Sequence, residues 1–159
     1  GLMQLLPGVG KQVAKSAGLP WNGANGLFDP EYNVQLGTRF LGQMAREFDG
    51  SPWLASAAYN AGARPVRRWL GERARLEPDF FIETIPYRET REYVARVLAF
   101  SVIYDWRMND KAVALSSRMP KAGQAARAPT ASTPPKRIVC EANTVAPARP
   151  ATAGGTGEG

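Results

Sequence analysis

Helix-starting signals recur along the first 119 residues and limit what this part of the chain can form. Asp29-Pro30 and Ser51-Pro52 each place a residue suited to capping a helix before a proline suited to its first turn. After Pro30, large apolar residues recur at helical spacing as far as Phe48, and Gly50 supplies a stop. The alternation of apolar and polar residues that indicates a strand does not occur. The sequence therefore predicts an all-α fold.

The predicted helices cover most of the first 106 residues. They span residues 8–17, 30–48, 52–59, 65–70 and 87–106. Loops or turn-rich segments are predicted at residues 18–28 and between Pro78 and Pro86. The apolar positions of the second helix are Val34, Phe40, Leu41, Met44 and Phe48. The expected buried stripe of the last helix is Tyr93, Val94, Val97, Leu98 and Val102. The pair Glu92 and Arg96 is expected on its outer side.

The aromatic residues divide into core and surface candidates. We expect four of them in the core rather than on a surface: Trp53, Trp69, Phe80 and Phe81. Trp21, in a loop rich in Gly and Asn, is the best candidate for an exposed ring on which a sugar could stack.

Composition changes near Met119. Residues 120–159 are rich in Pro, Ala, Thr and Gly and cannot bury enough apolar surface to offset the entropy of ordering. The sequence therefore predicts one domain over residues 1–119 and a disordered tail over residues 120–159. No run of 18 or more apolar residues occurs, so no transmembrane segment is predicted.

The net charge is +6, and residues 1–119 carry 15 basic and 12 acidic side chains. Small basic clusters lie at Arg64, Arg67, Arg68 and at Arg73, Arg75. A mildly basic surface suits an anionic polymer such as nucleic acid, anionic lipid, or a cell wall that bears peptide carboxylates. A solvated surface without any partner is the competing interpretation.

The chain contains no histidine and a single cysteine, Cys140. Catalysis by Ser-His-Asp or Cys-His groups is therefore excluded, as is an internal disulfide or a zinc site of the usual kind. Carboxylates, tyrosines and lysines are the groups left for general acid and base chemistry.

Three segments stand out together. They are Gly1-Leu2-Met3-Gln4-Leu5-Leu6-Pro7, then Ala57-Ala58-Tyr59-Asn60-Ala61-Gly62, and then residues 83–94, which read Glu-Thr-Ile-Pro-Tyr-Arg-Glu-Thr-Arg-Glu-Tyr-Val. In this order and at these separations, they resemble the soluble lytic transglycosylases of Gram-negative bacteria. Residues 27–33, Leu36-Gly37 and residues 115–120 also resemble that family, so the likeness covers essentially all of residues 1–120.

This resemblance implies a small lysozyme-like helical domain with a groove for a sugar polymer. Members of the family cleave the β-1,4 bond between N-acetylmuramic acid and N-acetylglucosamine. The muramic 6-hydroxyl attacks its own anomeric carbon, so the product carries a 1,6-anhydro end. One glutamic acid serves first as acid and then as base, and the substrate's N-acetyl group assists. The resemblance implies neither a cofactor nor a metal.

In the family, the acid glutamate lies in a Glu-Ser dipeptide shortly before the Gly-Leu-Met-Gln motif. This chain begins at the motif, so we expect the acid upstream of Gly1 and assign it to no residue here. Four glutamates on polar helix faces or loops are expected to be solvated charges: Glu31, Glu47, Glu72 and Glu77. We expect the chain alone to bind glycan weakly, to lack turnover and to be less stable than a full domain.

The resemblance assigns substrate-binding roles to Gln4, Tyr59, Asn60 and Glu89. Gln4 would bond sugar amides or hydroxyls, Tyr59 would support the acid, Asn60 would hold a loop, and Glu89 would bind a sugar hydroxyl or amide. We expect Gln4, Tyr59 and Glu89 to converge on one sugar-sized cleft. Each residue also has a purely structural interpretation. Gln4 suits an exposed amide and Tyr59 a half-buried aromatic, whereas Asn60 suits a helix end and Glu89 the first turn of a helix. Leu6 and Val9 depart from the family's pattern.

Two other functions stay open on these residues. One is a goose-type lysozyme-like hydrolase that uses water as the acceptor, and the other is a non-catalytic module that binds peptidoglycan. A nucleic-acid partner is disfavoured, because no basic helix with interleaved aromatics is apparent. The expected partner is the peptidoglycan glycan strand, bound by a monomer in the periplasm of a Gram-negative bacterium. Peripheral contact with the envelope membranes is left open.

Overall fold

The computed structural model describes residues 2–124, which form helices and turns without a strand in this range. The elements are α1 (Pro7–Ser16), η1 (Asn25–Phe28), α2 (Pro30–Glu47), α3 (Pro52–Ala61), α4 (Ala63–Arg73), α5 (Pro78–Glu83), α6 (Arg88–Asn109) and η2 (Leu115–Arg118), where η marks a 3-10 turn. The prediction of an all-α fold is confirmed. Helix α4 extends beyond the predicted residues 65–70 at both ends.

One segment predicted to be turn-rich is helical. Pro78 occupies the first turn of α5, and the side chains of Phe81 and Ile82 are buried against the rest of the fold. A proline at this position costs no hydrogen bond, because the first N–H groups of a helix have no partner within it. Tertiary burial therefore stabilises a helix that is too short for its periodicity to be recognised.

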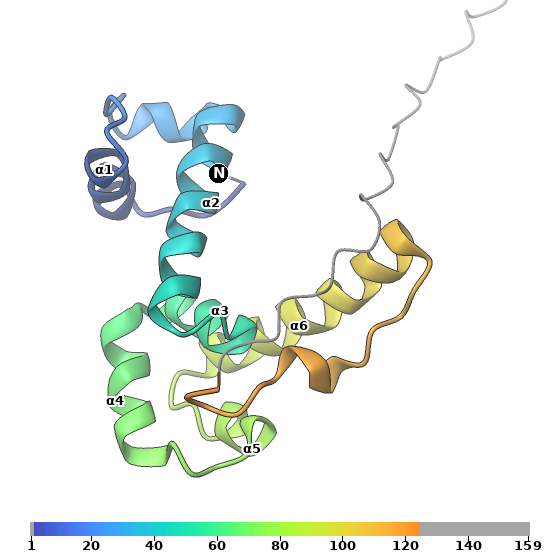
Figure 1. The fold of residues 1–159 in the computed structure, drawn as a ribbon. Coiled ribbons are helices and arrows are strands. Elements are labelled where there is room, and N and C mark those ends of the chain that lie inside the picture. Colours follow the sequence, from blue (N-terminus) through green and yellow to red (C-terminus); the bar gives the residue numbers. More distant parts are fainter. Residues whose placement is uncertain (1, 125–159) are drawn as a thin grey trace, which may run out of the picture.

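Helix α2 joins two hydrophobic clusters, and Figure 1 shows it running between the α1 region and the α3–α6 region. The smaller cluster contains Val13 and Ala14 of α1, Leu27 of η1 and Leu36 of α2. The larger cluster surrounds α3 and draws on α4, α5 and α6. Phe40, in the middle of α2, packs against both clusters, so α2 couples the start of the chain to the main core.

Helix α3 lies at the centre of the larger cluster, and every residue from 53 to 58 is buried. Most of these side chains are small, which allows α2, α4 and α6 to pack closely around it. Trp53, Trp69 and Phe81 are each only 1% exposed, as predicted, and Trp53 meets Phe81 edge to face with ring centroids 5.0 Å apart. Phe80 is 67% exposed, so its placement in the core was wrong. Adjacent residues on a helix point in different directions, so Phe81 faces the core while its neighbour Phe80 faces solvent.

The buried faces of the long helices differ in part from the expected stripes. On α2 the buried residues are Asn33, Leu36, Gly37 and Met44, whereas Val34 and Leu41 are each 40% exposed. On α6, Val94 and Leu98 are buried as expected, and Tyr93, Val97 and Val102 are half-buried. The pair Glu92 and Arg96 forms the expected ion pair at 3.6 Å. The second half of α6 leaves four large apolar side chains exposed: Phe100, Ile103, Tyr104 and Trp106.

The described chain continues past the predicted domain end at Met119. Trp53 donates its indole N–H to the carbonyl of Pro120 at 2.9 Å, Lys121 pairs with Glu77, and Ala122 packs against the larger cluster. Residues 125–159 of the predicted tail, including Cys140, lie outside the described residues, and the division of the chain stays a prediction. Within residues 2–124, no helix is both long and apolar enough to cross a bilayer.

The two cap-plus-proline signals start helices by different means. Asp29 Oδ1 accepts a hydrogen bond from the backbone N–H of Tyr32 at 2.7 Å, as a helix cap should. Ser51 occupies the corresponding position before α3, but its side chain makes no cap bond and its hydroxyl is buried without a partner. The predicted start of α3 is confirmed, although Pro52 and core packing define it without a serine cap.

Alanine substitutions at Asp29 and Ser51 test whether only Asp29 caps its helix through a side-chain hydrogen bond. We expect Asp29→Ala to lower the free energy of unfolding by about 1 kcal/mol, because it removes the bond to the Tyr32 N–H. Ser51→Ala should be neutral or stabilising, because it removes a buried hydroxyl without a partner. Urea denaturation followed by circular dichroism measures both, and an equal loss in the two variants would contradict this assignment.

Candidate functional site

The start of the chain is held against α3 by Tyr59. The Tyr59 hydroxyl donates to the backbone carbonyl of Met3 at 2.7 Å, between residues 56 positions apart. Tyr59 lies in the last turn of α3, and its ring packs against Phe40 of α2 with centroids 5.1 Å apart. One side chain therefore connects the first segment of the chain to both α2 and α3.

Asn33 of α2 holds the same segment from the other side. Its Oδ1 accepts the backbone N–H of Met3 at 2.8 Å, and its Nδ2 donates to the carbonyl of Leu27 at 2.8 Å. Asn33 is only 1% exposed, so both bonds are made away from water. A buried amide without partners is costly, and satisfying it here fixes Met3 and the η1 turn together. Both backbone polar groups of Met3 are thus bonded.

A glycine of α2 lets this segment approach the helix closely. A Cβ atom at Gly37 would lie 2.5 Å from both Cβ and Cγ of Met3. Contacts that short do not occur between real side chains, so any larger residue at Gly37 would displace Met3. Leu36-Gly37, one of the segments quoted for the family resemblance, therefore has a packing role beneath the first motif.

Gln4 follows directly and has a strained backbone. Its φ of 53° lies in the left-handed region, which a residue with a Cβ enters at a cost of about 1 kcal/mol. Its side chain is exposed and makes no hydrogen bond within residues 2–124. The bonds at Met3 hold this conformation in place, which leaves the polar amide of Gln4 exposed on the surface.

The end of α3 and the start of α6 are joined by a hydrogen bond between Thr90 and Asn60. The buried hydroxyl of Thr90 donates to Asn60 Oδ1 at 2.6 Å. Glu89, the neighbour of Thr90, lies in the first turn of α6, where the positive end of the helix dipole favours a carboxylate. Within the described part of the chain, neither the Asn60 Nδ2 donor nor the Glu89 carboxylate has a partner. Both groups are free to bind a ligand.

Burial controls the ionisation of Tyr59. Loss of water around its ring, and then the nearby Tyr93, raise the pKa of Tyr59 to about 12, and burial also raises the pKa of Tyr93. Tyr59 is therefore a neutral phenol at physiological pH. Its proton is committed to the Met3 carbonyl, so towards a ligand or an acid it offers the lone pairs of its oxygen.

No carboxyl group in residues 2–124 has the surroundings of a proton-donating acid. A carboxylic acid that stays protonated at neutral pH is usually buried in an apolar site. All Asp and Glu side chains in this range are exposed, except the half-buried Asp105, which pairs with Arg118. Glu31, Glu47, Glu72 and Glu77 are exposed as expected, and the last three pair with Arg67, Arg73 and Lys121. The same residues contain no group of three metal-ligating side chains.

The hydrogen bonds of the structure within residues 2–124 involve the sequence neighbours of Gln4 and Glu89, and not the side chains of Gln4 and Glu89 themselves. Tyr59 contacts Met3, which precedes Gln4, and Asn60 contacts Thr90, which follows Glu89. That Gln4, Tyr59 and Glu89 share one cleft stays a prediction. Sequence reasoning missed the positioning roles of Asn33, Gly37 and Thr90, although each lies in a segment quoted for the resemblance.

Trp21 differs from its expected role. It is half-buried, and its ring lies against Gly10, where a Cβ would come within 3.1 Å of the ring. The ring also packs on the smaller hydrophobic cluster. Trp21 therefore covers α1 instead of standing exposed as a stacking platform.

Comparisons with known proteins relate this chain to soluble lytic transglycosylases. The family described as Transglycosylase SLT domain matches residues 1–82, which is 82 of the 159 residues, and the Soluble lytic transglycosylase helical domain matches residues 84–112. The soluble lytic murein transglycosylase of Escherichia coli K12 is 41% identical over 119 residues, covering 74% of this chain. A putative soluble lytic murein transglycosylase of Haemophilus influenzae is 42% identical over 105 residues, covering 65% of this chain. This chain spans only 18% of the length of either relative.

Solved structures agree with the sequence comparisons. The 70-kDa soluble lytic transglycosylase of Escherichia coli superposes with a TM-score of 0.70 at 38% identity, over 79% of this chain and 20% of its own. The same enzyme in complex with bulgecin A gives a TM-score of 0.69 at 36% identity, with the same coverage. An inactive mutant of the lytic transglycosylase Slt from Pseudomonas aeruginosa gives 0.63 at 46% identity, over 67% of this chain and 17% of its own. The expected lysozyme-like helical fold is confirmed by these matches.

Two glycines of α2 allow a matched test of how the first segment is held. We expect Gly37→Ala to lower the free energy of unfolding by about 1–3 kcal/mol, because its Cβ would collide with Met3. Gly42→Ala, on the same helix, meets only the flexible end of Arg46 at 3.5 Å and should stabilise by about 0.5–1 kcal/mol through helix propensity. Guanidinium denaturation measures both. A gain in stability in both variants would show that Met3 does not pack on Gly37.

Proposed function

Because the chain belongs to the Transglycosylase SLT domain family, we propose that it is the glycan-binding part of a peptidoglycan lytic transglycosylase. The proposed substrate bond is the β-1,4 link from N-acetylmuramic acid to N-acetylglucosamine, and the proposed product carries a 1,6-anhydro muramic end. The proposed place of action is the periplasm. The observation that carries the proposal is the Tyr59 hydrogen bond to Met3, which brings the first and second family motifs together.

The proposed roles follow from the groups that are free to bind. The Gln4 amide can both donate to and accept from sugar hydroxyls and N-acetyl groups. The Glu89 carboxylate accepts hydrogen bonds from hydroxyls, and the Asn60 Nδ2 donates to a carbonyl or hydroxyl oxygen. Tyr59 holds Met3, the neighbour of Gln4, and presents its oxygen to the ligand. Such a set binds a neutral sugar backbone by hydrogen bonds and needs no metal.

We assign the proton work to a glutamic acid outside residues 1–159. Support comes from the exposure of the carboxylates in residues 2–124, because an acid that protonates a glycosidic oxygen at neutral pH needs a raised pKa. In the proposed reaction, that acid protonates the leaving oxygen and then removes the proton of the muramic 6-hydroxyl as this oxygen attacks the anomeric carbon. No water is consumed in this sequence.

Binding of a soluble glycan tests the assignment of Glu89. We expect Glu89→Gln to weaken binding of a tetrasaccharide of alternating N-acetylglucosamine and N-acetylmuramic acid, with its lactyl carboxyls capped as neutral amides, by about tenfold, as for one lost charge-assisted hydrogen bond. Glu31→Gln removes an equal charge from an exposed position on α2 and should leave the affinity unchanged. Isothermal titration calorimetry measures both dissociation constants.

Two outcomes would contradict the proposal. Equal weakening by both substitutions would mean that Glu89 acts only through net charge. Release of muropeptides from purified cell walls by the 159-residue chain itself would show that the acid lies within it. If the released muropeptides carried an added water in place of the anhydro end, a lysozyme-like hydrolase would be the correct assignment.

A further inference from the structure

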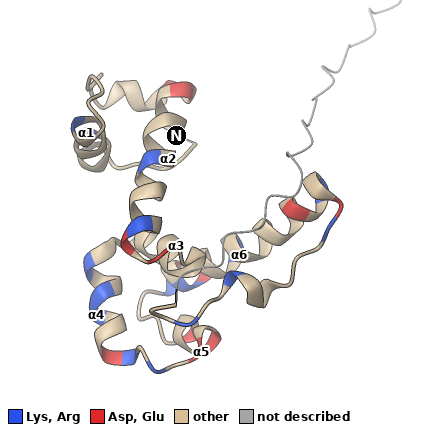
Figure 2. Ribbon diagram, viewed as in Figure 1, with Lys and Arg blue, Asp and Glu red and all other residues tan. Residues whose placement is uncertain are grey.

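The positive charge of the predicted domain is concentrated on one helix. Residues 1–119 have a net charge of +3, from 15 basic and 12 acidic side chains. Residues 63–75, which form α4 and the turn after it, contain five arginines and one glutamate, a net charge of +4. The other residues of the predicted domain therefore sum to −1. Figure 2 shows this concentration as the blue bands along α4.

Three of these five arginines form no ion pair or side-chain hydrogen bond within residues 2–124. Arg67 pairs with Glu47 at 2.7 Å, and Arg73 pairs with Glu72 at 3.4 Å while donating to the carbonyl of Thr84 at 3.1 Å. Arg64, Arg68 and Arg75 are exposed and have neither an ion pair nor a side-chain hydrogen bond anywhere in residues 2–124. We call these three residues the α4 arginine face.

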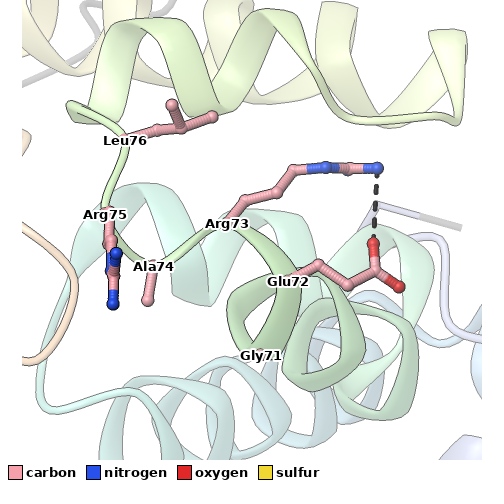
Figure 3. Close-up of a pocket in the computed structure, with 6 residues that line it drawn as sticks. All are labelled: Gly71, Glu72, Arg73, Ala74, Arg75 and Leu76. Carbon is pink, nitrogen blue, oxygen red and sulfur yellow. Dashed lines mark ion pairs between the residues drawn. The ribbon is translucent and has the colours of Figure 1, made fainter.

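The α4 arginine face has a fixed geometry. Val66 and Trp69 bury the opposite side of α4 against the core. Arg64 and Arg68 are four residues apart, which places them on one side of the helix about 6 Å apart along its axis. Arg75 follows in the turn, at the edge of a hollow lined by residues 71–76, and Figure 3 shows its side chain pointing away from the Glu72–Arg73 pair.

Helix α4 is connected to the candidate glycan site at two points. Gly62 alone separates α3 from α4, with φ of 89°, so Arg64 follows Asn60 by only four residues. The ring of Trp69 meets that of Tyr87 edge to face at 5.2 Å, and Tyr87 immediately precedes the first turn of α6 that contains Glu89. The Trp69–Tyr87 contact lies on the core-facing side of α4 and fixes this helix relative to the start of α6. The Cα atom of Arg64, on the other side of α4, lies within about 14 Å of that of Asn60, because only four residues join them.

We propose that the α4 arginine face binds the carboxylates of the peptide stems carried by the bound glycan strand. The inference rests on the proposed function and adds a second recognition element to it. The planar guanidinium matches a carboxylate with two parallel hydrogen bonds, and unpaired arginines have both available. The glycan backbone is neutral, so the stems are the part of this polymer that a basic face can recognise.

Other anionic partners fit the face less well. Single-stranded nucleic acid is held by bases stacked on exposed aromatic rings, and Trp69, the aromatic residue of α4, is only 1% exposed. A helix that lies on a membrane inserts its apolar side into the lipid, and that side of α4 is buried in the core.

The test compares the 159-residue chain on two forms of one ligand. The first is purified sacculi, and the second is the same sacculi with their stem carboxylates converted to neutral amides by carbodiimide and excess ethanolamine. The variants are Arg64→Gln/Arg68→Gln/Arg75→Gln and the matched control Arg39→Gln/Arg46→Gln/Arg107→Gln, which removes three exposed charges elsewhere. Binding is measured by co-sedimentation at increasing salt, with circular dichroism to establish folding.

We expect the α4 variant to bind untreated sacculi about tenfold more weakly, with the control changed less than about twofold. On amidated sacculi, all three proteins should bind alike, and salt should weaken binding only to the untreated form. Equal binding of wild type to both forms would overturn the stem proposal and leave the glycan proposal standing. Binding to neither form would overturn both. Tighter binding to vesicles of anionic phospholipid than to untreated sacculi would overturn the stem proposal in favour of a membrane surface.

Discussion

The hydrogen bond from Tyr59 to the carbonyl of Met3 is the constraint on which the site depends. It joins residues 56 positions apart, and burial raises the pKa of the phenol to about 12, so the donor keeps its proton well above neutral pH. Asn33 completes the fixation by accepting the Met3 N–H. The backbone N–H and carbonyl of Met3 are therefore both bonded. This holds the next residue, Gln4, in a strained backbone conformation with its side-chain amide free. The segment around Met3 and Gln4 is thus fixed on the surface of the fold.

Helix α3 supplies this constraint because it is buried on every side. Its small side chains let three helices pack around it, and its last turn presents Tyr59 and Asn60. The turn at Gly62 then starts α4 in a new direction, with a positive φ that favours glycine. Gly62 therefore lies between Tyr59 and Asn60, which are proposed to bind the sugar backbone, and the arginines of α4, which are proposed to bind the peptide stems.

Much of the fold followed from local signals. Caps, prolines and apolar spacing located α1, α2, α3 and α6, since these signals act within a few residues along the chain. Tertiary packing decided the rest. It made a helix of residues 78–83, turned Phe80 outwards and laid Trp21 on Gly10. The family motifs indicated Tyr59 and Asn60, but their partners Met3 and Thr90 depend on contacts across the fold that no local pattern encodes.

Hydrogen exchange at the Met3 amide tests most directly whether the first segment is held as described. This N–H lies two residues from the chain start, where an untethered segment exchanges at the rate of a free peptide. Because it is bonded to the buried Asn33, it should be protected to a degree comparable with amides in the middle of α2. Exchange at the free-peptide rate, while α2 and α3 remain protected, would contradict the account.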